Sequence, residues 1–150
     1  MMPRVGEQAP DFALPSTEGE LRLSEIAARK KVLLAFYVED NTPLCSSEIS
    51  VLREDYEIVQ QLGAQVIAVS ADTLESHRDF AERLGVPFPL VSDERLEAAI
   101  AYDVLDADSK RSRRAVFVIE AGKIVHAEPW FQPGNPTQYE EIFRALGFDA

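Results

Sequence analysis

Residues 31–37 read KVLLAFY, a continuous apolar run of strand length. Such a run is typical of a strand that is covered on both faces by other elements. Residues 65–70 read QVIAVS and predict a second strand of the same kind. Because helical patterns lie between and after these runs, we predict an α/β fold in which helices flank a mixed central β-sheet.

The segment after Thr42 predicts a helix that begins just beyond the first strand. Thr42 suits the N-cap position, and proline is favoured at the first helical position, where Pro43 stands. Gly63 suits the C-terminal end. Between them, apolar residues recur at spacings of three and four, as one face of a helix requires: Ile49, Leu52, Tyr56 and Val59.

Further elements follow along the chain. We expect a helix capped by Asp72 and ended by Gly85, with Leu74, Ala81 and Leu84 facing inward. A short strand is expected at Leu90 and Val91, and a helix over residues 94–102. Residues 115–120 and 123–127 predict a β-hairpin around Ala121-Gly122. Asn135 is expected to cap a last helix whose apolar stripe is Tyr139, Ile142, Phe143 and Leu146.

Since no repeat or linker is visible, we predict that residues 1–150 form a single domain.

The charge, hydropathy and cysteine content of the chain disfavour several classes of partner and location. The formal net charge is −11, which disfavours nucleic acid and anionic membranes as partners, because both attract clustered cations. No run approaches the roughly 18 apolar residues that a membrane span needs, and no secretory leader is visible. The single cysteine excludes a disulfide within the chain. These features predict a cytoplasmic protein.

Cys45 is the first candidate for chemistry. With Thr42 as N-cap, Cys45 is the third residue of the helix, where backbone N–H groups lack helical partners and the helix dipole is positive. Both effects favour a thiolate. The site also lies at the carboxyl end of a strand, where open α/β sheets bind ligands. The alternative is a buried, inert cysteine.

Three neighbours could assist Cys45. The Thr42 hydroxyl could donate toward the thiolate, or it could serve as a cap only. Glu48, one helical turn after Cys45, could orient a cation or hold a proton, or it could be an ordinary carboxylate. A thiolate that attacks a peroxide needs a cation to stabilise the leaving oxygen. Arg114 immediately precedes an apolar strand and could turn toward the sheet, whereas Lys110 and Arg111 are expected to be solvated.

The remaining conspicuous residues carry less weight. His77 and His126 lie far apart without a cysteine cluster, so we predict no metal site and interpret both as structural or surface residues. Trp130 and Phe131 are expected to pack on the core, and the alternative is that they line an access path to the site.

At this point the chain resembles the peroxiredoxin family (AhpC/TSA type), especially its bacterioferritin comigratory protein, or peroxiredoxin Q, branch. Residues 36–48 read FYVEDNTPLCSSE, which is similar to the family motif Pro-x-x-x-Thr-x-x-Cys followed by Glu. Residues 6–12, 69–72 and 85–93 match further stretches. Two positions depart from the pattern: Val38 replaces the motif's proline, and Ser50 replaces the branch's resolving cysteine.

The resemblance implies a thioredoxin-like fold and a role for each motif residue. Cys45 would be the peroxidatic nucleophile, and Thr42 would hydrogen-bond the thiolate and the peroxide. Arg114 would stabilise the thiolate and bind the peroxide oxygens, and Glu48 would hold a neighbouring group in place.

We therefore predict a one-cysteine peroxidase that reduces hydrogen peroxide and small alkyl hydroperoxides through a Cys45 sulfenic acid. An external thiol, from a thioredoxin-like protein, a small molecule or another subunit, would resolve that acid, with no bound cofactor. The protein would be a monomer or homodimer. A disulfide exchanger is disfavoured because a second cysteine is missing. A non-enzymatic redox sensor or binding module on a degenerate peroxiredoxin scaffold remains the alternative.

Overall fold

The computed structural model describes residues 2–106 and 108–148. Its strands are β1 (Ala13–Ser16), β2 (Gly19–Arg22), β3 (Lys31–Phe36), β4 (Ala64–Ser70), β5 (Leu90–Ser92), β6 (Leu105–Asp106), β7 (Arg111–Ser112), β8 (Ala115–Glu120) and β9 (Lys123–Glu128). Its helices are α1 (Leu23–Ala27), α2 (Pro43–Glu54), α3 (Tyr56–Gln61), α4 (Leu74–Leu84), α5 (Glu97–Ala101) and α6 (Pro136–Ala145).

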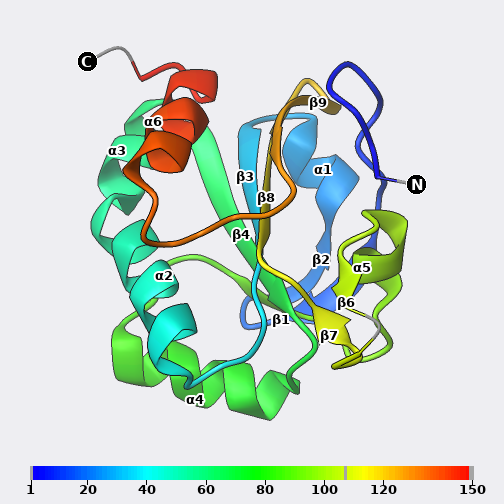
Figure 1. Ribbon diagram of the computed structural model, residues 1–150, viewed down its shortest axis with the longest axis vertical. Coiled ribbons are helices and arrows are strands. Elements are labelled where there is room, and N and C mark those ends of the chain that lie inside the picture. The colour runs from blue at the N-terminus through cyan, green and yellow to red at the C-terminus, as the bar shows by residue number, and fades with distance from the viewer. Residues whose placement is uncertain (1, 107, 149–150) are drawn as a thin grey trace.

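A seven-stranded sheet in the order β2-β1-β5-β4-β3-β8-β9 forms the centre of the fold (Figure 1). Strands β3, β4 and β5 run parallel to one another, whereas β8 pairs antiparallel with β3. The sheet is therefore mixed, as predicted. The small ribbon of β6 and β7 lies outside it.

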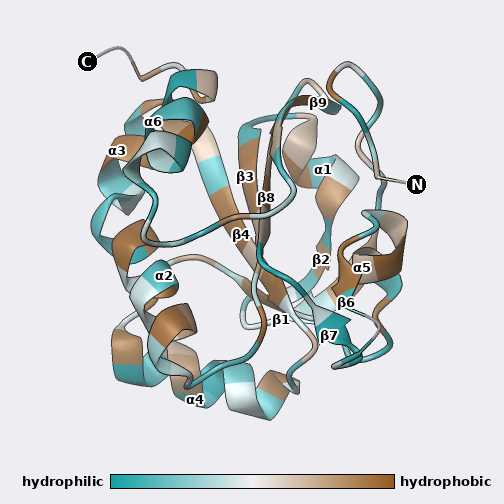
Figure 2. Ribbon diagram, viewed as in Figure 1, coloured by the Kyte–Doolittle hydropathy of each residue, from teal (hydrophilic) through white to brown (hydrophobic). Residues whose placement is uncertain are grey.

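The apolar run of β3 is explained by two cores, one on each face of the sheet. Val32, Leu34 and Phe36 belong to a core that includes residues of α1 and α5. The alternate residues Leu33 and Ala35 belong to a second core with residues of α2, α3, α4 and α6. Figure 1 shows these helices on opposite sides of the sheet, and Figure 2 shows the hydrophobic colouring concentrated on the central strands. Alternating side chains of a strand point to opposite faces, so a strand buried on both sides must be apolar throughout.

The helix predicted after Thr42 is two helices. α2 ends at Glu54 and α3 begins at Tyr56, with Asp55 between them at φ −90° and ψ 2°. Aspartate is a poor residue for a helix interior because its side chain competes for backbone hydrogen bonds. The apolar spacing continues across this break, which is why the pattern alone did not reveal it.

The cap predicted for α4 was wrong by one residue. Thr73, not Asp72, is the N-cap, and its hydroxyl accepts a hydrogen bond from the Ser76 N–H at 3.1 Å. The inward face was predicted in part: Ala81 and Leu84 are half-buried and pack against the core. The buried residues of α4 are Phe80 and His77, which were not predicted, and Leu74 is only half-buried. α5 is shorter than expected, and the elements β1, β2, α1, β6 and β7 were not predicted.

The C-terminal predictions are confirmed. β8 and β9 form the hairpin, and Ala121 and Gly122 have φ of 53° and 79°, as a tight hairpin turn requires. Asn135 caps α6 by accepting from two backbone N–H groups. Among the helices of the described residues, none combines the length and apolarity that crossing a membrane requires.

Candidate active site

Cys45 lies in the first turn of α2, as the sequence predicts. Thr42 is the N-cap in an extended conformation, and its Oγ1 accepts a hydrogen bond from the Cys45 N–H at 3.3 Å. Pro43 is the first helical residue. Cys45 is therefore the third residue of the helix, at the positive end of the helix dipole.

The thiol of Cys45 is enclosed by protein. Cys45 has 0% of its surface exposed and belongs to the core cluster that also contains Ile49 and Leu52 on the same helical face. Its neighbour Leu44 is 48% exposed. The first turn of α2 thus presents one side chain to solvent and the next one, Cys45, to the sheet.

The sheet topology brings Arg114 to this thiol. Because β8 runs antiparallel to β3, its first residue, Ala115, pairs with Phe36 at the end of β3. Arg114 precedes Ala115 and so reaches the loop that connects β3 to α2. Its Nη2 donates a hydrogen bond to Cys45 Sγ at 3.3 Å. A guanidinium in this position stabilises a thiolate by direct charge attraction.

Glu48 lies on the other side of Arg114. Its Oε1 is 3.7 Å from Arg114 Nε, and the carboxyl group is fully buried. Burial raises the pKa of Glu48 to about 8, against the opposing effect of Arg114. Within residues 2–106 and 108–148, neither carboxyl oxygen has a hydrogen-bond partner. A buried carboxyl group in this state favours the neutral, protonated form near neutral pH.

Tyr139 approaches this group from α6. Burial, together with the nearby Glu48 carboxyl, raises the pKa of Tyr139 to about 12. Its ring packs edge-on against Phe131 at a centroid distance of 5.2 Å. The backbone N–H of Phe131 donates to the carbonyl of Arg114 at 3.0 Å. The segment before α6 is thereby joined to the backbone of Arg114.

Thr42 lies beside the Cys45 backbone, and the two departures from the family motif lie before and after it in the chain. In this structure the Thr42 hydroxyl donates to the carbonyl of Glu39 at 3.3 Å, while it caps Cys45 as an acceptor. Ser50 is a half-buried residue of α2, and Val38 lies just beyond the end of β3, half-buried against the core. Thr42, Cys45, Glu48 and Arg114 are thus all brought together.

The expectation that Arg111 is solvated was wrong. Its Nη2 donates to Asp72 Oδ1 at 2.7 Å, and its Nε lies 3.9 Å from Glu39. Lys110 is exposed, as expected. Arg113 stacks over the ring of Trp130, with 4.1 Å between its guanidinium carbon and the ring centroid.

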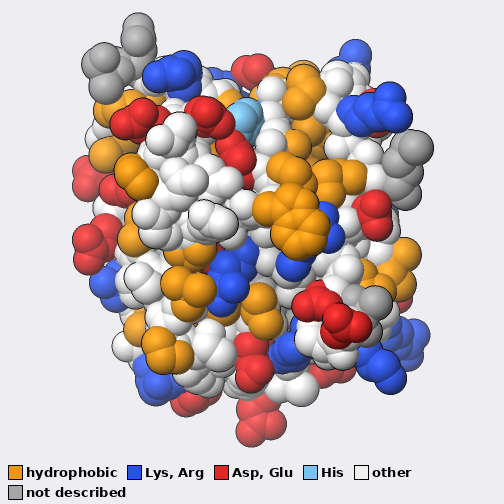
Figure 3. All heavy atoms as spheres, viewed as in Figure 1, with side chains coloured by type: hydrophobic (Ala, Val, Ile, Leu, Met, Phe, Trp, Pro, Cys, Tyr) orange, Lys and Arg blue, Asp and Glu red, His pale blue; other side chains and the backbone are white. Residues whose placement is uncertain are grey.

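Trp130 does not pack into the core, contrary to expectation. It is 69% exposed, whereas its neighbour Phe131 is buried. On the face shown in Figure 3, hydrophobic side chains gather near the middle with basic side chains beside them. A tryptophan can remain exposed at modest cost when a cation covers one face of its ring.

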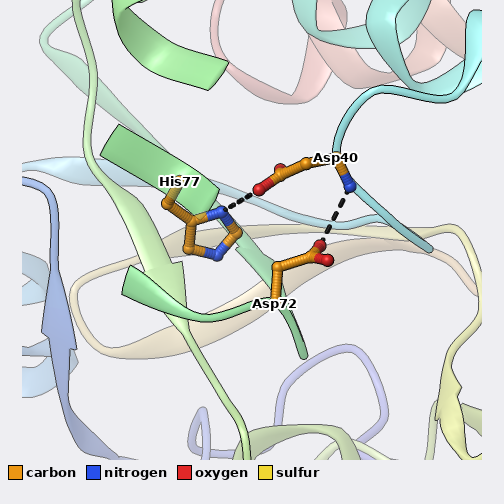
Figure 4. Close-up of side chains that lie close together, drawn as sticks. All are labelled: Asp40, Asp72 and His77. Carbon is orange, nitrogen blue, oxygen red and sulfur yellow. Dashed lines mark hydrogen bonds and ion pairs between the residues drawn. The ribbon is translucent and has the colours of Figure 1, made fainter. Parts of the chain in front are cut away.

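A buried polar cluster near the loop was missed by sequence reasoning. Asp40, Asp72 and His77 lie together, with the Asp40 carboxylate directed at His77 and the Asp72 carboxylate at the Asp40 backbone (Figure 4). One signal could have found it: Asp40 and Asp72 each follow the carboxyl end of a neighbouring parallel strand, where polar side chains converge.

This cluster has metal-ligating residue types but is organised as a hydrogen-bond network. His77 Nδ1 is 2.8 Å from Asp40 Oδ2, and His77 Nε2 is 2.9 Å from the carbonyl of Val91. Asp72 is bound by Ser70 and Arg111. Since both ring nitrogens already have partners, the donor set does not fit a metal ion. The other histidine, His126, is near the surface and contacts Glu128 at 2.9 Å.

Comparison with known proteins gives a consistent result. The AhpC/TSA family model matches residues 5–127. The chain is 36% identical over 148 residues to a peroxiredoxin of Thermoplasma volcanium, which covers 95% of this chain and 72% of the relative. It is 30% identical over 129 residues to a putative peroxiredoxin bcp of Coxiella burnetii, covering 82% of this chain and 85% of the relative.

A solved structure agrees over nearly the whole chain. A PrxQ mutant of Xylella fastidiosa superposes with a TM-score of 0.83 at 26% identity, covering 98% of this chain and 97% of that one. The thioredoxin-like fold implied by the sequence is thereby confirmed.

Proposed function

The chain belongs to the AhpC/TSA family and is a peroxiredoxin, a thiol-dependent peroxidase, and on this premise we propose that Cys45 is its peroxidatic residue. Cys45 is the only cysteine of the sequence. The observation that carries the proposal is the 3.3 Å contact between its Sγ and the guanidinium of Arg114. A helix N-terminus and a cation together act on one sulfur atom, which is the environment of a reactive thiolate.

The proposed reaction has two halves. In the first, the Cys45 thiolate attacks one peroxide oxygen and the O–O bond breaks. The other oxygen takes a proton and leaves as water or an alcohol, and Cys45 becomes a sulfenic acid. In the second, an external thiol condenses with the sulfenic acid and releases water, giving a mixed disulfide. A second external thiol then attacks this disulfide, which restores the Cys45 thiol and releases the oxidised reductant.

Arg114 stabilises charge at two stages of this scheme. It faces the thiolate before attack, and it is placed to donate to the oxygen that accumulates charge as the O–O bond breaks. Thr42 holds the first turn of α2 through its cap. In the resting site its hydroxyl proton is donated to the carbonyl of Glu39, and we propose that the hydroxyl turns from that carbonyl to donate to the bound peroxide.

We propose that Glu48 lies beside Arg114 as a neutral neighbour near neutral pH. Its Oε1 is 3.7 Å from Arg114 Nε without a hydrogen bond, and burial raises the pKa of Glu48 to about 8. A neutral partner leaves the full positive charge of Arg114 available to Cys45 and to the peroxide.

The reductant must come from outside the chain. Ser50 occupies the position where the related branch has its resolving cysteine, and a hydroxyl cannot form a disulfide. We propose a thioredoxin-like protein or a small thiol as reductant, in a cytoplasmic setting, and no bound cofactor because sulfur itself changes oxidation state. We further propose one domain over residues 1–150, a monomer or homodimer, and no nucleic-acid partner, given the charge of −11.

Peroxide turnover with a panel of thiol donors tests this function. Cys45 is expected to react with hydrogen peroxide far faster than a free thiol, and one equivalent should yield a sulfenic acid that dimedone traps, identified by mass spectrometry. Excess peroxide should give the sulfinic form. Cys45→Ser should abolish both the reaction and the adduct. A wild-type rate equal to that of a free thiol, with Cys45 unmodified, would contradict the assignment.

A further inference from the structure

A buried network ties the loop before Cys45 to the rest of the fold. The loop runs from Tyr37 to Thr42, which caps α2. Asp40, in its middle, is 4% exposed and accepts hydrogen bonds from the Tyr37 hydroxyl at 2.6 Å and from Ser76 Oγ at 2.8 Å. Its backbone N–H donates to Asp72 Oδ2 at 2.9 Å. Asp40 therefore connects β3, the end of β4 and α4.

The protons of this network can be assigned by counting donors and acceptors. His77 Nε2 lies 2.9 Å from the carbonyl of Val91, which can only accept, so Nε2 carries a proton. The single proton of the Tyr37 hydroxyl points to Asp40, and burial with the nearby Asp40 charge raises the pKa of Tyr37, so this donor is retained.

His77 Nδ1 therefore faces two acceptors. The Tyr37 oxygen is 3.2 Å away with its proton already used, and Asp40 Oδ2 is 2.8 Å away. The Asp40 carboxyl already accepts one hydrogen bond on each oxygen, from Tyr37 and from Ser76, so both oxygens serve as acceptors. The proton between the two side chains then belongs to Nδ1, so that an imidazolium faces a carboxylate in a fully enclosed site.

We propose that Asp40 and His77 form a buried carboxylate–imidazolium pair that positions the loop before α2 and thereby sets the reactivity of Cys45. Both are positioning residues, because they act through the loop and not on the peroxide. The inference rests on the proposed role of Cys45.

The reason that such a pair matters is geometric. Thr42 is only two residues beyond Asp40, and the intervening Asn41 has a φ of 68°, a left-handed conformation that asparagine adopts more readily than most residues. Further contacts fix the loop. Ser112 Oγ donates to the carbonyl of Tyr37 at its start at 2.8 Å, and Arg111 holds Asp72, which accepts from the Asp40 N–H in its middle. A displacement of the loop moves Thr42, the first turn of α2 and the thiol relative to Arg114.

Nitrogen NMR of the wild-type protein tests the pair without reference to activity. The sequence has two histidines, so the His126→Gln variant assigns the signals of His77. We expect both ring nitrogens of His77 to carry protons at neutral pH, and Asp40→Asn to remove the proton from Nδ1. An unprotonated Nδ1 in the wild-type protein would overturn the pair, whatever the peroxidase assay shows.

Kinetics of the same variants tests the positioning. Asp40→Asn and His77→Gln are each expected to slow peroxide attack by about tenfold per folded molecule, since small displacements of reacting groups are costly. The titration of the Cys45 thiolate, followed by ultraviolet absorbance, should move to higher pH in both. His126→Gln, the matched substitution at the other histidine, should leave both measurements unchanged.

Two further variants keep the test decisive. Ser76→Ala removes one hydrogen bond to Asp40 without removing a charge, and it should give a smaller change in the same direction if His77→Gln fails to fold. The double variant Asp40→Asn/His77→Gln should be no slower than the worse single variant, because it leaves no unpaired buried charge. Folded variants with wild-type rates and thiolate titrations, or fully additive losses in the double variant, would overturn the proposal. A wild-type protein inert to peroxide would instead overturn the role of Cys45.

Discussion

The Nη2 atom of Arg114 lies 3.3 Å from the Sγ atom of Cys45, although 69 positions separate the two residues in the chain. The contact joins the first turn of α2 to the start of β8 across the carboxyl end of β3. The same guanidinium also faces Glu48, so one cation connects the thiol to a buried carboxyl group.

Removing this cation should slow the reaction strongly. Arg114→Ala is expected to lower the rate of peroxide attack by about 10²- to 10³-fold, because it deletes a donor aimed at developing negative charge. It should also lower the thiolate fraction of Cys45 at neutral pH. Stopped-flow measurement of Cys45 oxidation checks the rate. Arg113→Ala is the control, since that residue covers Trp130 and should leave the rate unchanged. An unaltered rate in Arg114→Ala would mean that another cation serves the site.

The cap of α2 should contribute to both stability and rate. Thr42→Val keeps the shape of the side chain but deletes the oxygen that accepts from the Cys45 N–H. It should lower the free energy of unfolding by about 1 kcal/mol and slow peroxide attack. Urea unfolding and stopped-flow kinetics check the two effects. Thr42→Ser retains the oxygen and should behave close to wild type; a serine variant as impaired as the valine variant would contradict this interpretation.

Glu48 should make stability depend on pH. Burial raises its pKa from an ordinary value of 4.5 to about 8, so the folded chain holds this proton more tightly than the unfolded chain. The resulting stabilisation is fully present below the ordinary value and is lost as the pH rises toward about 8. Glu48→Gln cannot ionise, so its free energy of unfolding should fall less between about pH 5 and 8, by about 3 to 4 kcal/mol.

Urea unfolding at a series of pH values measures this difference. Glu57→Gln, at an exposed position of α3, is the control and should retain the wild-type pH dependence. If Glu48→Gln and wild type lose stability in parallel over this range, Glu48 is already ionised in the folded protein at the lower pH.

Val38 is the position where a proline should improve the site. It lies beyond the end of β3, so Val38→Pro should fold normally. Proline fixes φ and removes an N–H, which should tighten the loop and speed peroxide attack by about 3- to 30-fold. Rapid-mixing kinetics measure this gain, with Val38→Ala as a control for the loss of the valine side chain. Unfolding of the proline variant would show that the Val38 N–H is needed; a folded variant with an unchanged rate would make valine a neutral replacement.

Local signals in the sequence were sufficient for part of the site. Thr42, Pro43 and Cys45 are close in the chain, so the cap, the start of the helix and the position of the thiol follow from residue preferences alone. The burial of β3 on both faces of the sheet could also be predicted, because its continuous apolar run leaves neither face of the strand polar. The break at Asp55 was not, since the apolar spacing continues through it.

Residues that depend on tertiary packing were harder to predict. Arg114 could be proposed because it precedes an apolar strand, but its contact with Cys45 requires the register of β8 against β3. His77 is a polar residue on the inward face of an amphipathic helix, and only the spatial position of Asp40 explains its burial. Arg111 was misjudged for the same reason: its partner Asp72 is 39 positions away.

The pairing of Phe36 with Ala115 has a consequence for folding kinetics. A shift of one residue in this register would turn the side chains of β8 to the opposite face of the sheet and carry Arg114 away from the sulfur. This pairing joins distant segments of the chain, so its loop-closure entropy makes it slow to form. The recovery of peroxide reactivity during refolding therefore measures when β3 and β8 reach their native register. A chain with native helices but misaligned central strands would not reduce peroxide.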